Sequence, residues 1–191
     1  MKKQDVIVQL EDNKYYILAN STYADDKVRV LNYGDTFGIF DRWGDAQQIG
    51  EGAQGIYHKG TRFISNMEFL LNGHRPLLLS SNIKKENEIL SIDLTNPDMD
   101  INEEGAIKKG TLHIARTKFL QDGVCHESVI VHNYGSETYN IELYFSFTSD
   151  FKDIFEIRGM KRKHKGKLSS PVIKDNSIRL SYFGLDELRR Q

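Results

Sequence analysis

The chain has 191 residues, of which 39% are hydrophobic and 28% charged, and its 26 basic and 27 acidic side chains give a net charge of −1. A chain of this length buries roughly 70% of its surface on folding, so it is large enough to form a hydrophobic core. The charge balance provides no overall field for nucleic acid or an anionic membrane, and the single cysteine, Cys125, excludes an intrachain disulfide.

The N-terminal segment, MKKQDVIVQLEDNKYY, breaks its apolar run after a few residues and has no cleavage site of small residues. Neither a signal peptide nor a membrane-spanning segment is therefore expected. The cytoplasm is the expected compartment, and neither a membrane nor nucleic acid is an expected partner.

Tight turns punctuate the chain from this end onward. Asn72-Gly73 and Asp122-Gly123 are typical of type I′ hairpins, because both residues of each pair tolerate a positive φ. Asp12-Asn13 and Asp175-Asn176 are weaker examples of the same pattern. The chain is predicted to be a series of hairpins.

Two stretches show the alternation of a half-covered strand most clearly. Residues 61–71 alternate, and Ile64 and Leu70 on their more polar side indicate that a second layer covers part of that face. Residues 138–148 also alternate, and their apolar face consists of Ile141, Leu143, Phe145 and Phe147.

Only two segments predict helix. Residues 150–158, DFKDIFEIR, place Phe151, Ile154 and Phe155 on one side with Asp150 as the N-cap. A second helix is expected to begin at LDELRR, residues 185–190. About a dozen short strands with one or two short helices predict an all-β fold, an antiparallel β-sandwich, with a barrel as the alternative. Residues 1–191 are expected to form a single domain.

Motifs for catalysis or metal binding are not found in the sequence. Cys125 and His126 are neighbours on a predicted strand, so their side chains point to opposite faces. The six histidines lack the spacing of metal ligands, and no carboxylates form the facing pair that glycoside hydrolysis needs. We expect no catalytic residue, no metal and no cofactor.

Two segments are candidates for ligand binding. The basic run KRKHKGK, residues 161–167, has no aromatic residue on which a base could stack, and a solvated loop is favoured. Residues 41–55 are glycine-rich and are interpreted as a long mobile connection. Trp43 within them is either a platform for a sugar ring or a tryptophan that folds back on its own sheet.

Seven strings in order resemble the N-terminal domain of bacterial and archaeal glycogen-debranching-enzyme-like proteins, the amylo-alpha-1,6-glucosidase family. They are YGDTFGIFDRWGD (33–45), GIYHKGTRFIS (55–65), LNGHRPLLLSS (71–81), DLTNPD (93–98), KKGTLHIARTKFL (108–120), HNYGSE (132–137) and SDFKDIFEIRG (149–159). No single string is diagnostic, but the ordered set covers most of the chain.

The resemblance implies a supersandwich of antiparallel sheets that precedes a helical (α/α) toroid, which holds the catalytic carboxylates of a glycoside hydrolase acting on α-glucan. No toroid is present in this sequence, so we expect the N-terminal part of a longer protein, or one piece of a split protein. The chain alone is expected not to be an enzyme. Its expected partners are the helical catalytic domain, in the same or a companion chain, and α-glucan.

The resemblance also implies where an interface would lie. The loop with His58 and Arg62 would face the helical domain or the glycan cleft, and Arg42, His58 and Arg62 would donate hydrogen bonds to hydroxyls or partner carboxylates. Two departures concern this region: Gly60 replaces an acidic residue that the family commonly has, and Trp43 replaces a small or acidic one.

Three rivals to a supporting domain stay open. A free-standing carbohydrate-binding module would be retained by glycogen. A complete enzyme on a sandwich would release reducing sugar unaided. A protein-interaction module would use its sheet edges for assembly.

Overall fold

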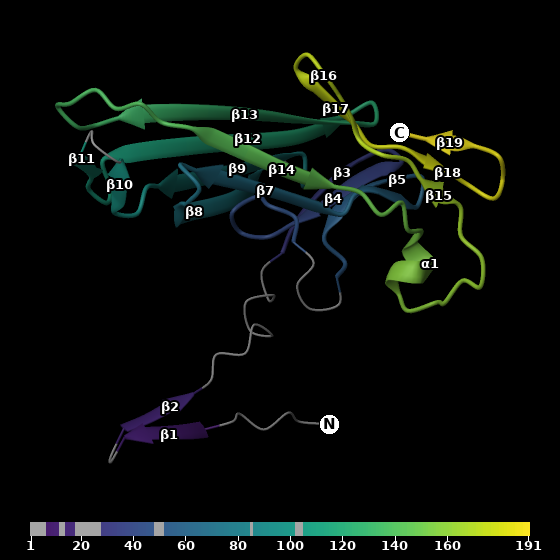
Figure 1. Ribbon diagram of the computed structural model, residues 1–191, viewed down its shortest axis with the longest axis horizontal. Helices are drawn as coiled ribbons and strands as arrows, with labels where there is room; N and C mark the ends of the chain where they lie inside the picture. Colours follow the sequence, from purple (N-terminus) through teal and green to yellow (C-terminus); the bar gives the residue numbers. More distant parts are fainter. Residues whose placement is uncertain (1–6, 12–13, 18–27, 48–51, 85, 102–104) are drawn as a thin grey trace.

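The computed structural model describes residues 7–11, 14–17, 28–47, 52–84, 86–101 and 105–191. Within these residues the regular secondary structure is almost entirely antiparallel strand, with one short helix, which confirms the predicted all-β fold (Figure 1).

The strands before residue 100 are β1 (Ile7–Glu11), β2 (Lys14–Ile17), β3 (Arg29–Tyr33), β4 (Thr36–Phe40), β5 (Gly55–His58), β6 (Thr61–Ile64), β7 (Asn66–Leu71), β8 (Leu77–Lys84) and β9 (Ile89–Thr95). Those that follow are β10 (Met99–Ile101), β11 (Gly105–Ile107), β12 (Leu112–Gln121), β13 (Val124–Asn133), β14 (Leu143–Thr148), β15 (Lys167–Leu168), β16 (Val172–Lys174), β17 (Ser177–Arg179), β18 (Tyr182–Phe183) and β19 (Arg189–Arg190).

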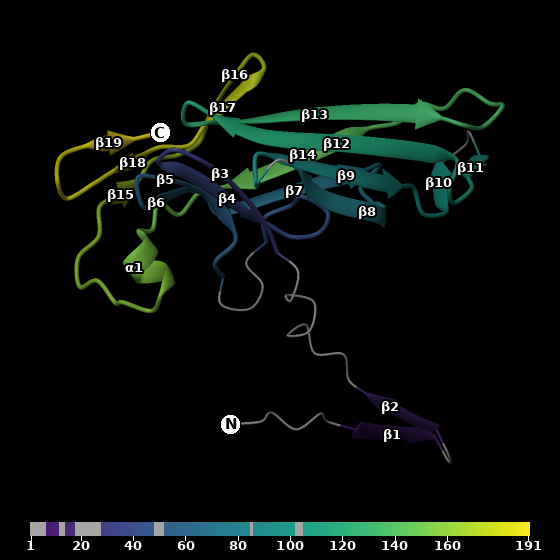
Figure 2. The same cartoon turned by 180° about the vertical axis from the view of Figure 1, so that it is seen from behind.

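Two layers enclose the core. One layer is the sheet β13-β12-β9-β8, and the other contains the sheet β3-β4-β5-β6 and the pair β14-β7, which Figure 2 shows from the opposite side. The core combines the inward residues of β9 and β12 with those of β3, β4 and β7. Its most deeply buried apolar members include Leu31, Phe40, Phe69, Leu71, Leu90, Leu94 and Ile114.

Smaller sheets complete the structure: β1-β2, β10-β11, β16-β17 and the three-stranded β15-β18-β19. The described strands form a sandwich without a closed barrel, so the barrel alternative is not supported.

The turn predictions are largely confirmed. Asp122 and Gly123 have φ values of 49° and 79° and join β12 to β13, and the Asp175 turn joins β16 to β17. Asn72-Gly73 also turns with positive φ, but the strands it joins enter different layers, since β7 pairs with β14 and β8 with β9. The predicted turn at Asp12-Asn13 lies outside the described residues.

The alternating stretches are partly confirmed. Residues 61–71 divide at Ser65 into β6 and β7, and β7 buries Met67, Phe69 and Leu71 as predicted. In β6 the buried residue is Arg62, because an ion pair replaces apolar packing there. The strand predicted over residues 138–148 covers only Leu143–Thr148.

The first helix prediction is too long. The helix α1 covers only Ile154–Ile157, and its N-cap is Asp153, whose carboxylate accepts hydrogen bonds from two backbone N–H groups of the first turn. Glu156 completes the capping box. Asp150, the predicted N-cap, is paired with Arg62 instead, and Phe151 has a φ of 48° that no helix allows.

The second helix prediction is wrong. Residues 185–190 form a turn followed by β19, which pairs with β18. Asp186 bonds Arg190 across this turn rather than capping a helix, and two prominent apolar residues of the segment, Leu185 and Leu188, are exposed.

Candidate functional site

The loop that follows β4 is fixed by Asp41. Its Oδ1 accepts hydrogen bonds from the backbone N–H groups of Trp43, at 2.8 Å, and Asp45, at 3.0 Å. Gly44 has a φ of 79°, and a Cβ there would lie 2.8 Å from the Cδ1 of Ile92. The described part of the predicted mobile connection is therefore an ordered turn, and the loop continues into Ala46, which exchanges backbone hydrogen bonds with β7.

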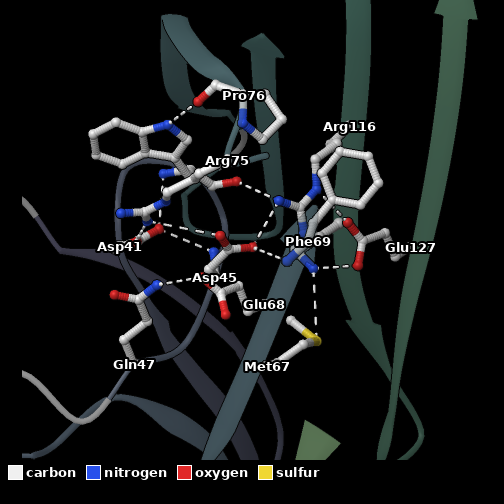
Figure 3. Close-up of polar contacts among 12 residues, drawn as sticks. Asp41, Asp45, Gln47, Met67, Glu68, Phe69, Arg75, Pro76, Arg116 and Glu127 are labelled. Carbon is white, nitrogen blue, oxygen red and sulfur yellow. Dashed lines mark hydrogen bonds and ion pairs between the residues drawn. The ribbon is translucent and has the colours of Figure 1, made fainter. Parts of the chain in front are cut away.

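A buried ion-pair network joins this loop to β12 and β13 (Figure 3). The Arg116 Nη1 lies 2.7 Å from the Asp45 Oδ1 and also donates to the Trp43 carbonyl, while its Nε lies 2.7 Å from the Glu127 Oε1. The Lys118 Nζ donates to the other oxygen of Glu127. We call Asp41, Asp45, Arg75, Arg116, Lys118 and Glu127 the Arg116 network.

Burial dominates the electrostatics of this network. It raises the pKa of Asp45 to about 6, against the lowering effect of the Arg116 charge. Burial also lowers the pKa of Lys118, an effect that Arg116 increases and Glu127 opposes. For Arg116, burial lowers the pKa, but Asp45 and Glu127 outweigh it and the pKa is raised. The carboxylates of Asp45 and Glu127 are thus held against cations in the core.

Arg75 is the most exposed member of the Arg116 network, and Trp43 packs against it. The indole Nε1 donates to the Pro76 carbonyl at 2.9 Å, and the Arg75 guanidinium lies 4.2 Å from the ring centroid. Arg75 also pairs with Asp41. The indole is thus fixed against its own chain and covered by a cation, and its use as a sugar platform stays a prediction.

A second buried pair, Arg62 with Asp150, ties β6 to the segment before α1. The Arg62 Nε lies 3.1 Å from the Asp150 Oδ1, and its Nη1 donates to the carbonyls of Gly52 and Gln54. Burial raises the pKa of Asp150, but the hydrogen bond and charge of Arg62 outweigh this effect, and the pKa is lowered. Because Arg62 is only 1% exposed, its donors serve its own chain.

The four predicted site residues do not converge. Trp43 belongs to the loop above the Arg116 network and Arg62 to the second pair. The His58 Nδ1 lies 2.8 Å from the Thr36 Oγ1, and Arg42 is exposed, without a hydrogen-bond partner among the described residues. Their role toward carbohydrate or a neighbouring domain stays a prediction.

A mainly apolar groove of about 1160 Å³ opens between β13 and β14, and residues 176–180 and Gln191 also line it. His58 and Phe63 lie along it, together with Cys125 and Val129 of β13 and Phe145 and Phe147 of β14. Burial raises the pKa of the Cys125 thiol, which therefore stays protonated at neutral pH. Cys125 faces the groove and His126 stacks on Phe119 on the opposite face, as the strand periodicity predicts.

The geometry supports no bond-breaking chemistry in the Arg116 network. Asp45 is 1% exposed and held by Arg116, so a substrate cannot approach its carboxylate. In the described ranges no three His, Cys, Asp or Glu side chains gather as metal ligands. The same ranges contain no helix long and apolar enough to cross a bilayer.

Residues 31–191 match the family described as the N-terminal domain of (some) glycogen debranching enzymes. The chain belongs to this family. Neither a curated protein nor a solved structure matches it. Both buried ion-pair clusters of this debranching-enzyme N-terminal domain fall inside the matched residues, and the resemblance carried by the seven strings is confirmed.

The signal for the Arg116 network in the sequence is strand parity rather than a motif. Arg116 and Lys118 share the strand parity of Leu112, Ile114 and Leu120, so β12 turns two cations toward the core of the debranching-enzyme N-terminal domain. Glu127 likewise shares the parity of Cys125 and Val129 in β13. Charges at core-facing positions of neighbouring strands predict a buried ion pair.

Proposed function

We propose that the chain is the non-catalytic sandwich domain of a debranching-type glycosidase that acts on α-glucan in the cytoplasm. Its role is to support a helical catalytic domain, in the same or a companion chain, and to shape the glucan cleft. The family match supports the parent activity. The buried, cation-bound Asp45 and Glu127 support a structural role for the carboxylates of the Arg116 network.

A docking role is supported by the many large apolar side chains that are exposed in the residues after β14. Large apolar residues between positions 155 and 188 are more than half exposed, among them Phe155, Met160, Leu168, Val172, Ile173, Ile178, Phe183, Leu185 and Leu188. Exposed apolar area of this extent on a soluble domain marks a surface that a partner covers. A helical domain with an apolar face is the partner that the proposal assigns.

Reconstitution tests this proposal. The chain is co-expressed with the helical domain of a debranching-type glycosidase from the same genome, and co-purification and glucose release from glycogen are measured. We expect a complex that the substitution Ile173→Glu or Leu185→Glu weakens at least about tenfold, since either change places a charge in an apolar interface. The matched control, Ser128→Glu on the outer face of β13, should bind normally. Equal binding of all the variants, or no complex, contradicts the proposal.

A second candidate function is binding of α-glucan by the chain itself. It is favoured by an aromatic cluster on the outer face of the sheet β13-β12-β9-β8. The rings of His113, His132 and Tyr134 have centroids 6.2 to 6.4 Å apart, and Tyr134 is 75% exposed. Asp93 lies 3.1 Å from the His113 Nε2 and supplies a polar group beside the rings. Such rings suit the apolar face of a glucose unit.

Affinity electrophoresis through glycogen separates this candidate from the first. Binding at the cluster predicts that glycogen slows the native chain and that the substitution Tyr134→Ala abolishes the effect. The substitution Tyr33→Ala, which removes another exposed ring at the end of β3, is the matched control. Unchanged migration of the native chain in glycogen excludes the carbohydrate-binding function.

A further inference from the structure

The strand β14 faces the core but is left uncovered on one side. Its register places Leu143, Phe145 and Phe147 opposite Leu71, Phe69 and Met67 of β7. The three β7 residues are at most 5% exposed, whereas Phe145 is 37% and Phe147 38% exposed. In the part of the chain that the structure describes, β14 has a partner strand on one edge only. Its two phenylalanines therefore lie on a core face that is incomplete.

The backbone of β14 offers hydrogen bonds to the open side. The Asn72 N–H donates to the Glu142 carbonyl at 2.8 Å, so the even-numbered residues of β14 direct their backbone groups toward β7. Met67, opposite Phe147, exchanges its hydrogen bonds with Ala46 on the far side of β7. The N–H and C=O groups of the odd-numbered residues of β14 therefore point to the free edge.

This edge lacks the features that usually prevent strand pairing. The strand, LYFSFT, contains no charged residue, proline or bulge. The edge strands of the two four-stranded sheets each carry a charge, at Arg29 in β3, Arg62 in β6, Lys84 in β8 and Glu127 in β13. Among the described edge strands of the two layers, β14 is the one that carries no charge and pairs on one edge only.

We propose that β14 pairs antiparallel with β14 of a second copy of this chain, around a two-fold axis at Phe145. In this register Phe145 lies opposite Phe145 of the second copy, and Leu143 lies opposite Phe147. Every core-facing position then meets an apolar one, and on the other face Tyr144 meets Ser146. The odd-numbered residues that form these pairs are those whose backbone groups are free, and each pair exchanges two hydrogen bonds.

Self-pairing also closes the groove. The groove lies between β13 and β14, and Phe145 and Phe147 are part of its lining. The core-facing side chains of the second β14 extend this lining across the two-fold axis, so both copies gain cover for the same two rings. This association requires no catalytic domain and goes beyond the proposed function. A strand of a different protein is the competing occupant.

Sedimentation equilibrium of the purified chain, over about 1 to 100 µM, tests the pairing. We expect the average mass to approach twice the 22.0 kDa of one chain. The substitution Phe145→Lys should raise the dissociation constant at least about tenfold, because it opposes two like charges in an apolar site. Phe155→Lys, at an exposed aromatic position on α1, is the matched control and should associate normally. Circular dichroism verifies that each variant is folded.

Cysteine cross-linking tests the register and does not depend on the stability of the lysine variant. Residues directly opposite in a hydrogen-bonded pair have Cα atoms about 5.5 Å apart, which suits a disulfide. With Cys125 replaced by Ala, F145C should cross-link to its own copy under oxidation. T148C, about 20 Å from its own copy in this register, should not. A native chain that stays at 22.0 kDa, a folded Phe145→Lys variant that still dimerises, or equal cross-linking at both positions overturns the proposal.

Discussion

Removing the Glu127 carboxylate is expected to lower the free energy of unfolding strongly. Removing the Lys118 ammonium as well should restore most of that free energy. Lys118 is fully buried, and its charge-assisted hydrogen bond is to Glu127; the other polar atom within reach is the Met67 sulfur, at 4.0 Å. The substitution Glu127→Leu fills a similar volume but leaves this ammonium without an anion. Breaking a buried pair in this way costs about 3–5 kcal/mol, a large part of a typical domain stability of about 5–15 kcal/mol.

The double variant K118M/E127L separates a buried charge from a packing defect. Arg116 keeps Asp45 as its ion-pair partner in this variant, and the unpaired ammonium is gone. We expect the free energy of unfolding to return to within about 1–2 kcal/mol of the native value, since apolar replacements of buried pairs are often neutral. Urea unfolding monitored by circular dichroism measures all three differences. A loss below about 1 kcal/mol for Glu127→Leu, or a double variant no more stable than it, refutes the reasoning.

Three further predictions concern the ordered loop and the two buried carboxylates. The pKa of Asp45 is about 6 in the folded state, above the ordinary value of 3.8. The contribution of the protonated Asp45 to the free energy of unfolding is therefore full below pH 3.8 and is lost as the pH rises through 6. The native chain should therefore lose about 2 kcal/mol relative to Asp45→Asn between pH 4 and pH 7, and a constant difference in urea unfolding contradicts this. The pKa of Asp150 is lowered, so Asp150→Asn should cost about 2 kcal/mol at pH 7, with the loss shrinking as the native carboxylate is protonated below pH 3.8; a loss independent of pH argues against the ion pair. Gly44→Ala should cost about 1–3 kcal/mol in thermal unfolding, and more than Gly34→Ala, whose Cβ would meet open space; equal costs would mean that Ile92 yields.

Strand periodicity predicted much of this fold because one face of most strands packs on the core. The apolar face of β7 and the turn at Asp122-Gly123 follow directly from local pattern. The helix prediction at residues 150–158 was too long for a tertiary reason. Asp150 is used by Arg62, 88 positions earlier in the chain, and no local pattern reveals that pairing.

The candidate site was harder to predict for the same reason. The sequence predicts Arg62 as a donor to a partner, and Trp43 as either a sugar platform or a tryptophan folded back on its own sheet. In the structure each bonds to its own chain across a long separation in sequence. No sequence motif marks the Arg116 network; its signal is the strand parity of its charged residues. The alternation of β12 predicts that Arg116 and Lys118 face the core, but Asp45, the partner of Arg116, lies in a loop that only the folded structure brings near.

Glucose released from glycogen by the purified native chain alone is the most direct measure of the central claim, that this is a supporting domain without catalysis of its own. The account predicts no release above that of a heat-denatured sample. Sustained release that disappears when one of the chain's own carboxylates, such as Asp41 or Glu127, is replaced by its amide would contradict it.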